Sequence, residues 1–414
     1  MFAWRIGGLA SGSDTLHTTL VLANKLAYVY DSSTVTIYGN VVKATHGQTQ
    51  GEVLGDGNAS EALQRFPLHQ SPLTYLPAAT PDGSESTLVV RVNELEWHEA
   101  PNLFVLGSSD RQYVTQTDDS AVTTAIFGDG VHGLRVPTGT GNVKAEYRSG
   151  TGQAGNVDAG QISQLATQPL GVKGVINPLP AAGGADGDTR DQARRNVPIG
   201  VTALDRLVSL ADYGDFARKF AGIGKASALR LTDGRRLLVH LTIAGKDDVP
   251  IDPTTDLYHA LVLALEQAGD SNQPIQIALR RLKVLVIAAG VRIKPDYKWE
   301  VVAATVRSTL LDLYSFDRRA LGQSAFLSEA VSAMQAVAGV QFVDMQTFDS
   351  VSESVTAKQL AKLAGTLTLR SVVEAQLARV DSTATDPAKR IVPAELAILI
   401  PDIPDTLILN EITK

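Results

Sequence analysis

Hydrophobic positions follow two different periods in two parts of the chain. Between about residues 86 and 157, short runs alternate between apolar and polar residues, and glycine-rich connectors separate these runs. This period of two predicts half-buried strands joined by tight turns. Beyond residue 225, β-prone runs alternate with segments whose apolar residues recur every three or four positions, which indicates helices. The chain is therefore expected to be α+β and multi-domain.

The first part is expected to be a hairpin-rich β domain that leads into a helical connector. Its strands are predicted over the alternating run LVVRVNELEWHE at 88–99 and over Tyr113–Thr117, Val122–Phe127 and Val143–Tyr147. Their spacing is typical of a small barrel or sandwich.

The second part is expected to form small α/β sandwich units. Asp212, Thr255 and Asp296 each precede a run of helical period, which predicts that they are the N-caps of three helices. Asp233-Gly234 lies between two β-prone runs and is a strong signal for a short hairpin. The remaining elements are a helix over 326–338 and strands over 227–231, 236–243, 275–279, 284–293 and 340–345.

The two ends of the chain carry less regular patterns. Residues 16–31 place apolar side chains at helical spacing, residues 34–42 alternate like a strand, and a Gly-, Gln- and Pro-rich stretch then runs to about residue 80. Residues 391–412 are strongly apolar, yet three prolines prevent a continuous helix. Such an extended C-terminal tail must bury its side chains either on the body of the chain or on a partner.

These patterns divide the chain into five segments. In order, we expect an irregular N-terminal segment, a β-rich domain, a connector with one helix, an α+β sandwich region, and a loop with the extended tail. Their bounds are 1–80, 81–168, 169–225, 226–350 and 351–414.

Composition narrows the classes of function. The net charge of −7 argues against broad nucleic-acid binding, which leaves a basic surface. The absence of cysteine removes disulfides, thiolate nucleophiles and cysteine-based zinc sites. The longest apolar run, Val284–Val291, is far shorter than the roughly 20 residues of a membrane helix. We therefore expect neither nucleic-acid binding nor direct membrane insertion.

Two glycine motifs have the spacing of a dinucleotide-binding turn, namely Gly128–Gly133 and Gly150–Gly155. In such a turn the glycines lead from a strand into a helix whose N-terminus holds a pyrophosphate. Pro137 follows the first motif closely, and Gly160 and Pro169 interrupt the segment after the second, so neither leads into a helical pattern. Glycines at hairpin turns are the favoured interpretation, and no cofactor is expected.

Other catalytic or metal-binding patterns are also incomplete. The seven histidines are not paired at ligand spacing, and Asp186-Gly187-Asp188 lacks the remaining positions of a calcium loop. The serines do not form a nucleophile elbow. A pair of carboxylates that meets only in the fold stays open. We expect no catalytic and no metal site.

The connector carries three arginines within six residues, Arg190, Arg194 and Arg195. They form a candidate partner interface, because guanidinium groups bind carboxylates in a bidentate manner. The plainer alternative is a solvated helix with local ion pairs, which contribute little stability.

Several passages of the chain closely resemble the baseplate J-like family, the baseplate assembly proteins of contractile phage tails and injection systems. The most specific passage runs from Phe127 to Lys225 and begins FGDGVHGLRVPTGTGNVKAEYRSGTGQAGNV. The others are ATHGQTQGEVLGDG, SFDRRALGQ and PAELAILIPDIPDTLILNE. The resemblance covers about residues 20–414. Family chains are generally longer at the N-terminus, so this chain is expected to be a shorter form or to lack a leading domain.

The resemblance implies a structural wedge protein and not an enzyme. Family members assemble, usually as two copies with a companion wedge protein, into a ring of wedges around the central spike. They join the hub to the sheath and transmit the change that triggers contraction. The implied partners are therefore a second copy, the companion wedge protein, the spike or hub, the sheath and neighbouring wedges. Assembly is expected in the cytoplasm, into a phage-tail-like particle.

The apolar tail completes the candidate partner interface. Each fully buried Leu or Ile contributes roughly 1.5–3 kcal/mol, so a few anchors are enough to hold a joint between neighbouring wedges. The residues concerned are Leu396, Ile398, Ile400, Leu407 and Leu409. Two other functions compete with the wedge role: a tail-associated cell-wall hydrolase and a receptor-binding fibre module.

Overall fold

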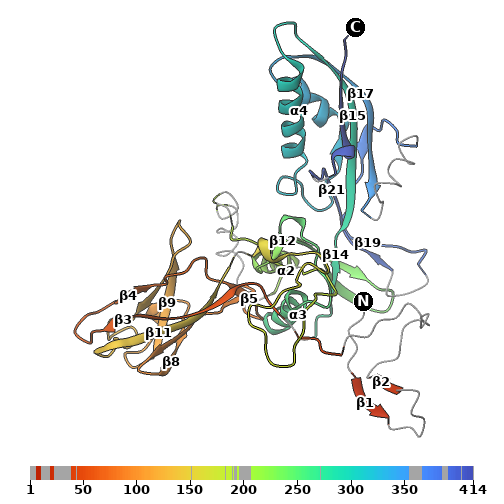
Figure 1. Cartoon of the computed structure of the whole chain (residues 1–414). Coiled ribbons are helices and arrows are strands. Elements are labelled where there is room, and N and C mark those ends of the chain that lie inside the picture. The colour runs from red at the N-terminus through yellow and green to blue at the C-terminus, as the bar shows by residue number, and fades with distance from the viewer. Residues whose placement is uncertain are drawn as a thin grey trace. The chain divides into compact units, whose positions relative to one another are not determined.

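The computed structural model divides the chain into two compact units (Figure 1). The smaller unit comprises Met1–His46 and Val157–Ala181, and the larger comprises Gly47–Asn156 and Ala182–Lys414. The residues that the structure describes are 6–10, 19–22, 39–42, 44–150, 152–181, 183–188, 190, 194, 207–270, 272–353, 366–384, 390–401 and 403–413.

The smaller unit contains a two-stranded antiparallel ribbon. Strand β1 (Ile6–Ala10) pairs with β2 (Thr19–Leu22). The helix expected over 16–31 is therefore wrong at 19–22, where backbone pairing with β1 decides the conformation. The rest of that segment, and most of the strand expected over 34–42, lie outside the described residues.

The larger unit begins with a seven-stranded, almost closed barrel. The strand order is β3-β11-β7-β8-β9-β10-β4, and all neighbours are antiparallel except β8 and β9. A Cβ on Gly55 of β3 would meet the ring of Phe66 of β4 at 3.0 Å, so the two edge strands approach each other. The strands are β3 (Gln48–Gly57), β4 (Arg65–Pro67), β7 (Val89–Val92), β8 (Leu95–Glu99), β9 (Gln112–Thr117), β10 (Thr123–Phe127) and β11 (Gly139–Ser149). Shorter elements are the hairpin β5 (Tyr75–Pro77) and β6 (Ser84–Ser86), η1 (Leu103–Val105) and η2 (Gln153–Gly155).

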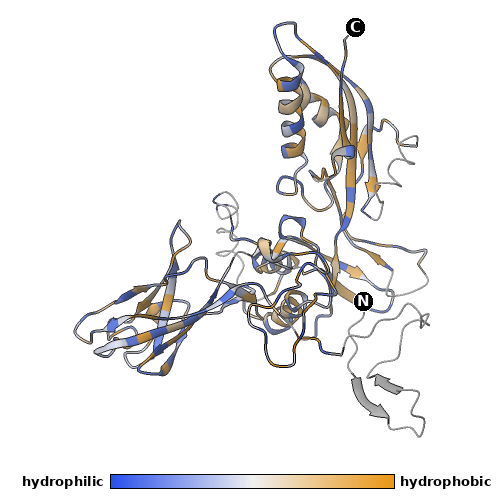
Figure 2. Cartoon of the chain, viewed as in Figure 1, coloured by the Kyte–Doolittle hydropathy of each residue, from blue (hydrophilic) through white to orange (hydrophobic). Residues whose placement is uncertain are grey.

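The alternating run at 88–99 is a hairpin and not one strand. Asn93 and Glu94 both have positive φ, 52° and 65°, as a tight hairpin turn requires. Val90 is buried before the turn and Trp97 after it, so the buried positions are even-numbered before the turn and odd-numbered after it. Hydrophilic and hydrophobic residues alternate along the barrel strands in Figure 2.

Phe127 lies at the centre of the barrel core and is fully buried. Its ring makes edge contacts with Phe66 and Trp97, at centroid distances of 5.6 and 5.4 Å. Tyr113 lies 5.9 Å away and donates its hydroxyl hydrogen bond to the carbonyl of Leu88 at 3.1 Å. Such ring pairs add to the stability that burial itself provides.

A central module follows, built on the three-stranded sheet β12-β13-β14. Its β12 and β13 form the expected hairpin at Asp233-Gly234, and β14 pairs in parallel with β13 after the crossover helix α3. Thr255 is the N-cap of α3, as predicted. The elements are α2 (Leu210–Lys219), β12 (Ile223–Thr232), β13 (Leu237–Gly245), η3 (Lys246–Asp248), α3 (Asp256–Ala268) and β14 (Ile275–Leu279).

Helix α2 begins three residues earlier than predicted. Its N-cap is Ser209, whose hydroxyl accepts a hydrogen bond from the Asp212 amide at 3.3 Å. The Asp212 carboxylate in turn accepts from the Ser209 amide at 2.7 Å. Asp212 is thus the third helical residue of a capping box, and these hydrogen bonds hold its pKa below the usual range.

The C-terminal module is a sheet covered by two helices, with β15 in the middle. β17 pairs antiparallel with β15 on one side, and β21 and β22 pair in parallel with successive parts of β15. Figure 1 shows α4 running along the long strands β15 and β17. The main elements are β15 (Arg281–Ile293), α4 (Trp299–Leu313), β16 (Ala325–Phe326), α5 (Leu327–Gln335), β17 (Val340–Ser352), β21 (Glu395–Ile398) and β22 (Leu407–Glu411). The minor ones are β18 (Val372–Val373), β19 (Arg379–Val380), β20 (Ile391–Val392) and η5 (Pro404–Thr406).

The prediction that Asp296 caps α4 is wrong, because the N-cap is Lys298 and its side chain makes no capping bond.

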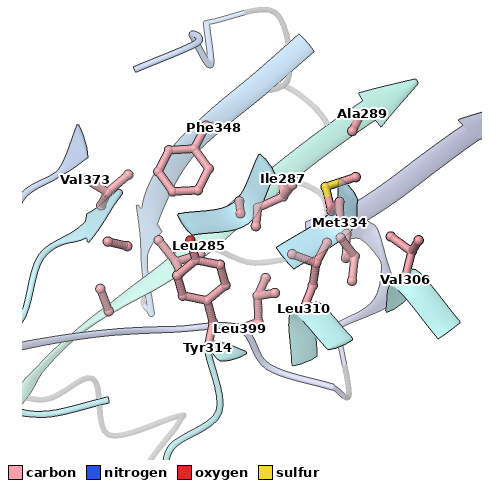
Figure 3. Close-up of a cluster of buried hydrophobic side chains, with 14 of the residues drawn as sticks. Leu285, Ile287, Ala289, Val306, Leu310, Tyr314, Met334, Phe348, Val373 and Leu399 are labelled. Atoms are coloured by element: carbon pink, nitrogen blue, oxygen red, sulfur yellow. The ribbon is translucent and has the colours of Figure 1, made fainter. Parts of the chain in front are cut away.

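The module is held by a core in which side chains from the sheet meet those of both helices (Figure 3). In this view the sheet residues Leu285, Ile287 and Phe348 point toward residues of the two helices. Those residues are Leu310 of α4, Tyr314 at the end of α4, and Met334 of α5.

The apolar tail is part of this module. Leu399 and Leu407 are 2% exposed and belong to the same core as Leu285, while Leu396 and Ile398 pack with strand β15 residues on a smaller cluster. Of the two alternatives for the tail, the structure thus shows burial on the chain's own body. The α+β, multi-domain class is confirmed.

Truncating a tail side chain is expected to destabilise the protein according to its burial. Leu399→Ala should lower the free energy of unfolding by about 2–5 kcal/mol, because it removes a buried side chain and leaves a cavity. Ile408→Ala is the matched control on an exposed tail residue and should cost no more than about 1 kcal/mol. Urea unfolding monitored by circular dichroism measures both. Equal losses would contradict the assignment of the tail to the core.

A buried histidine predicts a pH dependence of stability. His240 of β13 is fully buried, and its Nε2 has no hydrogen-bond partner in the described part of the chain. Burial lowers its pKa to about 4. The unfolded chain binds this proton from about pH 6.5 downward, so stability falls as the pH drops from about 6.5 to 4, by about 3 kcal/mol. His240→Leu should flatten this part of the stability profile, and an unchanged profile would contradict the assignment.

Candidate functional site: two joints beside the connector

Two groups of contacts within the larger unit tie the barrel to the central module, and both use glycine. The first, the hairpin joint, sets the β5–β6 turn against the end of α2. The Ala221 amide donates to the Asp82 carbonyl at 3.0 Å, and Lys219 Nζ lies 2.9 Å from the Asp82 carboxylate. Gly83 has φ +75°, and a Cβ there would lie 2.6 Å from the buried Phe220 ring. Only glycine satisfies both the turn and this approach.

The second, the clamp joint, is formed by residues 183–188 of the connector. The side chain of Asn156 brackets Gly184: its Oδ1 accepts from the Gly184 amide at 2.9 Å, and its Nδ2 donates to the Gly184 carbonyl at 2.8 Å. A Cβ on Gly184 would overlap the carbonyl oxygen of Gly152. The Gln153 amide donates to Asp186 Oδ1 at 2.9 Å. These hydrogen bonds, together with the close approach of the Gly184 and Gly152 backbones, hold residues 183–188 against the end of the barrel.

Lys246 connects the clamp joint to the central module. Its Nζ donates to the Asp186 carbonyl at 2.6 Å and to Asp188 Oδ1 at 2.8 Å, and its side chain is only 14% exposed. The Asp186-Gly187-Asp188 triplet therefore holds a lysine and a backbone amide. No group of three or more potential metal-ligating side chains was found among the described residues.

The connector arginines are only partly described. Arg190 and Arg194 are helical residues with exposed side chains, and Arg195 lies outside the described residues. Their binding of a partner's carboxylates stays a prediction.

The tail residues of the candidate interface divide into two sets. Leu396, Ile398 and Leu407 are buried in the chain's own core, so their side chains are not available to a partner in this fold. Ile400 and Leu409 are partly buried, and a partner role for them stays a prediction.

The buried carboxylates of the described residues, Asp349 and Glu395, are each paired with a cation. Asp349 lies 2.8 Å from Arg370 Nε and accepts from two backbone amides, while Glu395 lies 3.0 Å from Lys283 Nζ. For both acids burial acts to raise the pKa, but these bonds outweigh it and hold the pKa below the usual range. Neither has the raised pKa of a general acid.

None of the described helices is long and apolar enough to span a bilayer.

A glycine comparison tests the clamp joint. Gly184→Ala should lower the free energy of unfolding by about 1–3 kcal/mol, because the added methyl group meets the backbone at Gly152. Gly187→Ala is the matched control, since a Cβ there has open space, and it should be neutral or slightly stabilising. Thermal unfolding distinguishes the two variants. Equal midpoints would show that the close approach at Gly184 does not exist.

Comparison with known families gives two matches on this part of the chain. Residues 106–184 match the Baseplate J-like protein barrel domain, and residues 205–278 match the Baseplate J-like central domain. The clamp joint thus begins where the first match ends, and Lys246 lies within the second. The barrel in the structure starts earlier than the match, at β3.

No curated protein matches the chain. Among solved structures, the chain is similar to a chain of the anti-feeding prophage baseplate, determined by cryo-EM with six-fold symmetrisation, at 10% identity and a TM-score of 0.34. That alignment covers 86% of this chain and 77% of the other. The chain therefore contains a baseplate J-like barrel domain followed by a baseplate J-like central domain, which supports a structural component of a baseplate.

Proposed function

We propose that this protein is a wedge subunit in the baseplate of a contractile injection system or phage-tail-like particle. In this role it links the central spike or hub to the sheath and transmits the trigger for contraction. The observation that carries the proposal is the succession of two baseplate J-like domains, joined in the structure by the hairpin and clamp joints. Its function is structural and not enzymatic.

Transmission of a movement requires rigid contacts between the domains. Both joints depend on close backbone approach at glycine, and the clamp joint also has the largely buried Lys246 paired with Asp188; close-packed contacts of this kind transmit strain. A third link lies between β14 and β15. There Arg280 makes two hydrogen bonds to Asp248, at 2.5 and 2.8 Å, and one to Glu353 at 2.9 Å. Burial disfavours the Arg280 charge, but these carboxylates outweigh it and raise the pKa.

The partners in this proposal are a second copy of the chain, a companion wedge protein, the spike or hub, the sheath and neighbouring wedges. Assembly takes place in the cytoplasm before the particle is released. The buried carboxylates described above give a cell-wall hydrolase no specific support, since they are committed to ion pairs. A receptor-binding fibre module would have long repeated β-segments, and the sequence shows no such repeat.

Removal of the gene from a producing strain tests the wedge role. We expect sheath and tube proteins to accumulate without complete baseplates, as seen by electron microscopy. Complementation with the Gly187→Ala variant should restore contractile particles, and Gly184→Ala should restore fewer, because its clamp joint is disturbed. Intact contractile particles in the deletion strain would contradict the proposal.

A further inference from the structure

The turn that follows β13, Lys246–Asp248, has a backbone conformation that its residues do not favour. Asp247 and Asp248 both have positive φ, 52° and 62°, and the Val249 amide donates to the Lys246 carbonyl at 3.0 Å. These are the features of a type I′ turn, in which glycine is preferred at the second central position. Left-handed residues that carry a side chain also rarely occur in succession. The turn therefore needs support from its surroundings.

The two ends of this turn bind different parts of the larger unit. Lys246 Nζ binds the clamp joint through Asp188 Oδ1, at 2.8 Å. Asp248 binds the link between β14 and β15, because its carboxylate accepts hydrogen bonds from Arg280 at 2.5 and 2.8 Å. The side chains of Lys246, Asp248 and Arg280 are 14%, 16% and 13% exposed, so solvent screens these ion pairs only weakly.

Asp248 occupies the position where turn chemistry favours glycine, and its side chain there provides the carboxylate that binds Arg280. A local departure from the preferred turn residue is typical of a functional position. The two ion pairs are therefore the support that holds the turn in its left-handed conformation.

Only Asp247 separates the two anchoring residues, and the backbone around the turn is closely packed. The Lys246 amide donates to the Gly222 carbonyl at 2.9 Å. A Cβ on Gly245 would lie 2.1 Å from the Val249 carbonyl oxygen. A rotation of the turn backbone therefore displaces both anchoring side chains together.

We propose that Lys246–Asp248 is a two-state relay between the clamp joint and the link between β14 and β15. While both ion pairs are formed, the turn stays left-handed and the two contacts are rigid. When a movement breaks one pair, the turn relaxes and the geometry of the other pair is lost. An element whose two states are biased from both of its ends is the physical basis for coupling between distant contacts. The use of this relay in the contraction trigger rests on the proposed function.

The test breaks the clamp contact and measures amide hydrogen exchange at the other end of the relay, by mass spectrometry of the purified full-length chain. Asp188→Asn removes the charge that binds Lys246. The Arg280 and Arg281 amides, which each donate a 2.9 Å hydrogen bond to a carbonyl, should then exchange at least about fivefold faster. Two independent ion pairs would instead leave their exchange unchanged.

The matched control is Asp82→Asn at the hairpin joint. It removes the carboxylate charge 2.9 Å from Lys219 Nζ, in an ion pair that also joins the barrel to the central module but lies outside the turn. Exchange at Arg280 should stay at the level of the unmodified chain.

Coupling through the turn must also act in the opposite direction. Arg280→Lys keeps the charge but loses the two-point contact with Asp248. It should accelerate exchange of the Gly184 amide, which is held at 2.9 Å from Asn156 Oδ1 in the clamp joint.

A further variant tests the role of the left-handed backbone. Asp247→Gly removes the Cβ from the first central position, so the turn needs less support from the ion pairs. In this background, Asp188→Asn should accelerate exchange at Arg280 by less than about twofold.

Three results would overturn the relay: equal exchange at Arg280 in the Asp188→Asn and Asp82→Asn variants, an undiminished effect in the Asp247→Gly background, or equal acceleration across the whole chain, which reports global unfolding. Each of them would leave the wedge role standing, because exchange is measured on the isolated chain. Intact contractile particles in the deletion strain would overturn the wedge role and leave the relay standing.

Discussion

The pairing of β15 on both of its sides is the constraint on which the C-terminal module depends. β17 pairs with it antiparallel, and β21 and β22 pair in parallel along the opposite side. Parallel neighbours cannot be joined by a tight turn, so they must come from a distant part of the chain. The module is therefore complete only when the last residues of the chain have reached β15, and their apolar side chains close the same core that α4 and α5 cover.

Local sequence signals predicted the elements that their own residues determine. Thr255 caps α3, and Asp233-Gly234 turns the β12–β13 hairpin, as expected. The signals failed where two adjacent patterns compete. Ser209 and Asp212 are both good capping residues, and only their reciprocal hydrogen bonds show which of them is the N-cap. The turn at Asn93-Glu94 contains no glycine, so the alternation on either side of it was interpreted as one strand.

The joints could not be predicted, because their glycines resemble ordinary turn glycines. What distinguishes Gly184 is the carbonyl of Gly152, more than thirty positions earlier in the printed sequence, which leaves no space for a side chain. The tail posed the same problem. Its apolar character predicted burial, but whether the covering surface belongs to the same chain depends on β15, which the tail's own sequence does not specify.

The Gly128–Gly133 loop shows how turn chemistry decides between two functions of one motif. A pyrophosphate site needs backbone amides that are free to donate to the ligand. Here Asp129 already accepts from the amides of Val131 and His132, and this bonding holds its pKa at about 2, so it stays charged and repels a phosphate. The same bonds fix the backbone that carries the exposed Val131. The hydrogen bonds that make the loop unsuitable for a nucleotide therefore also hold its backbone in one conformation.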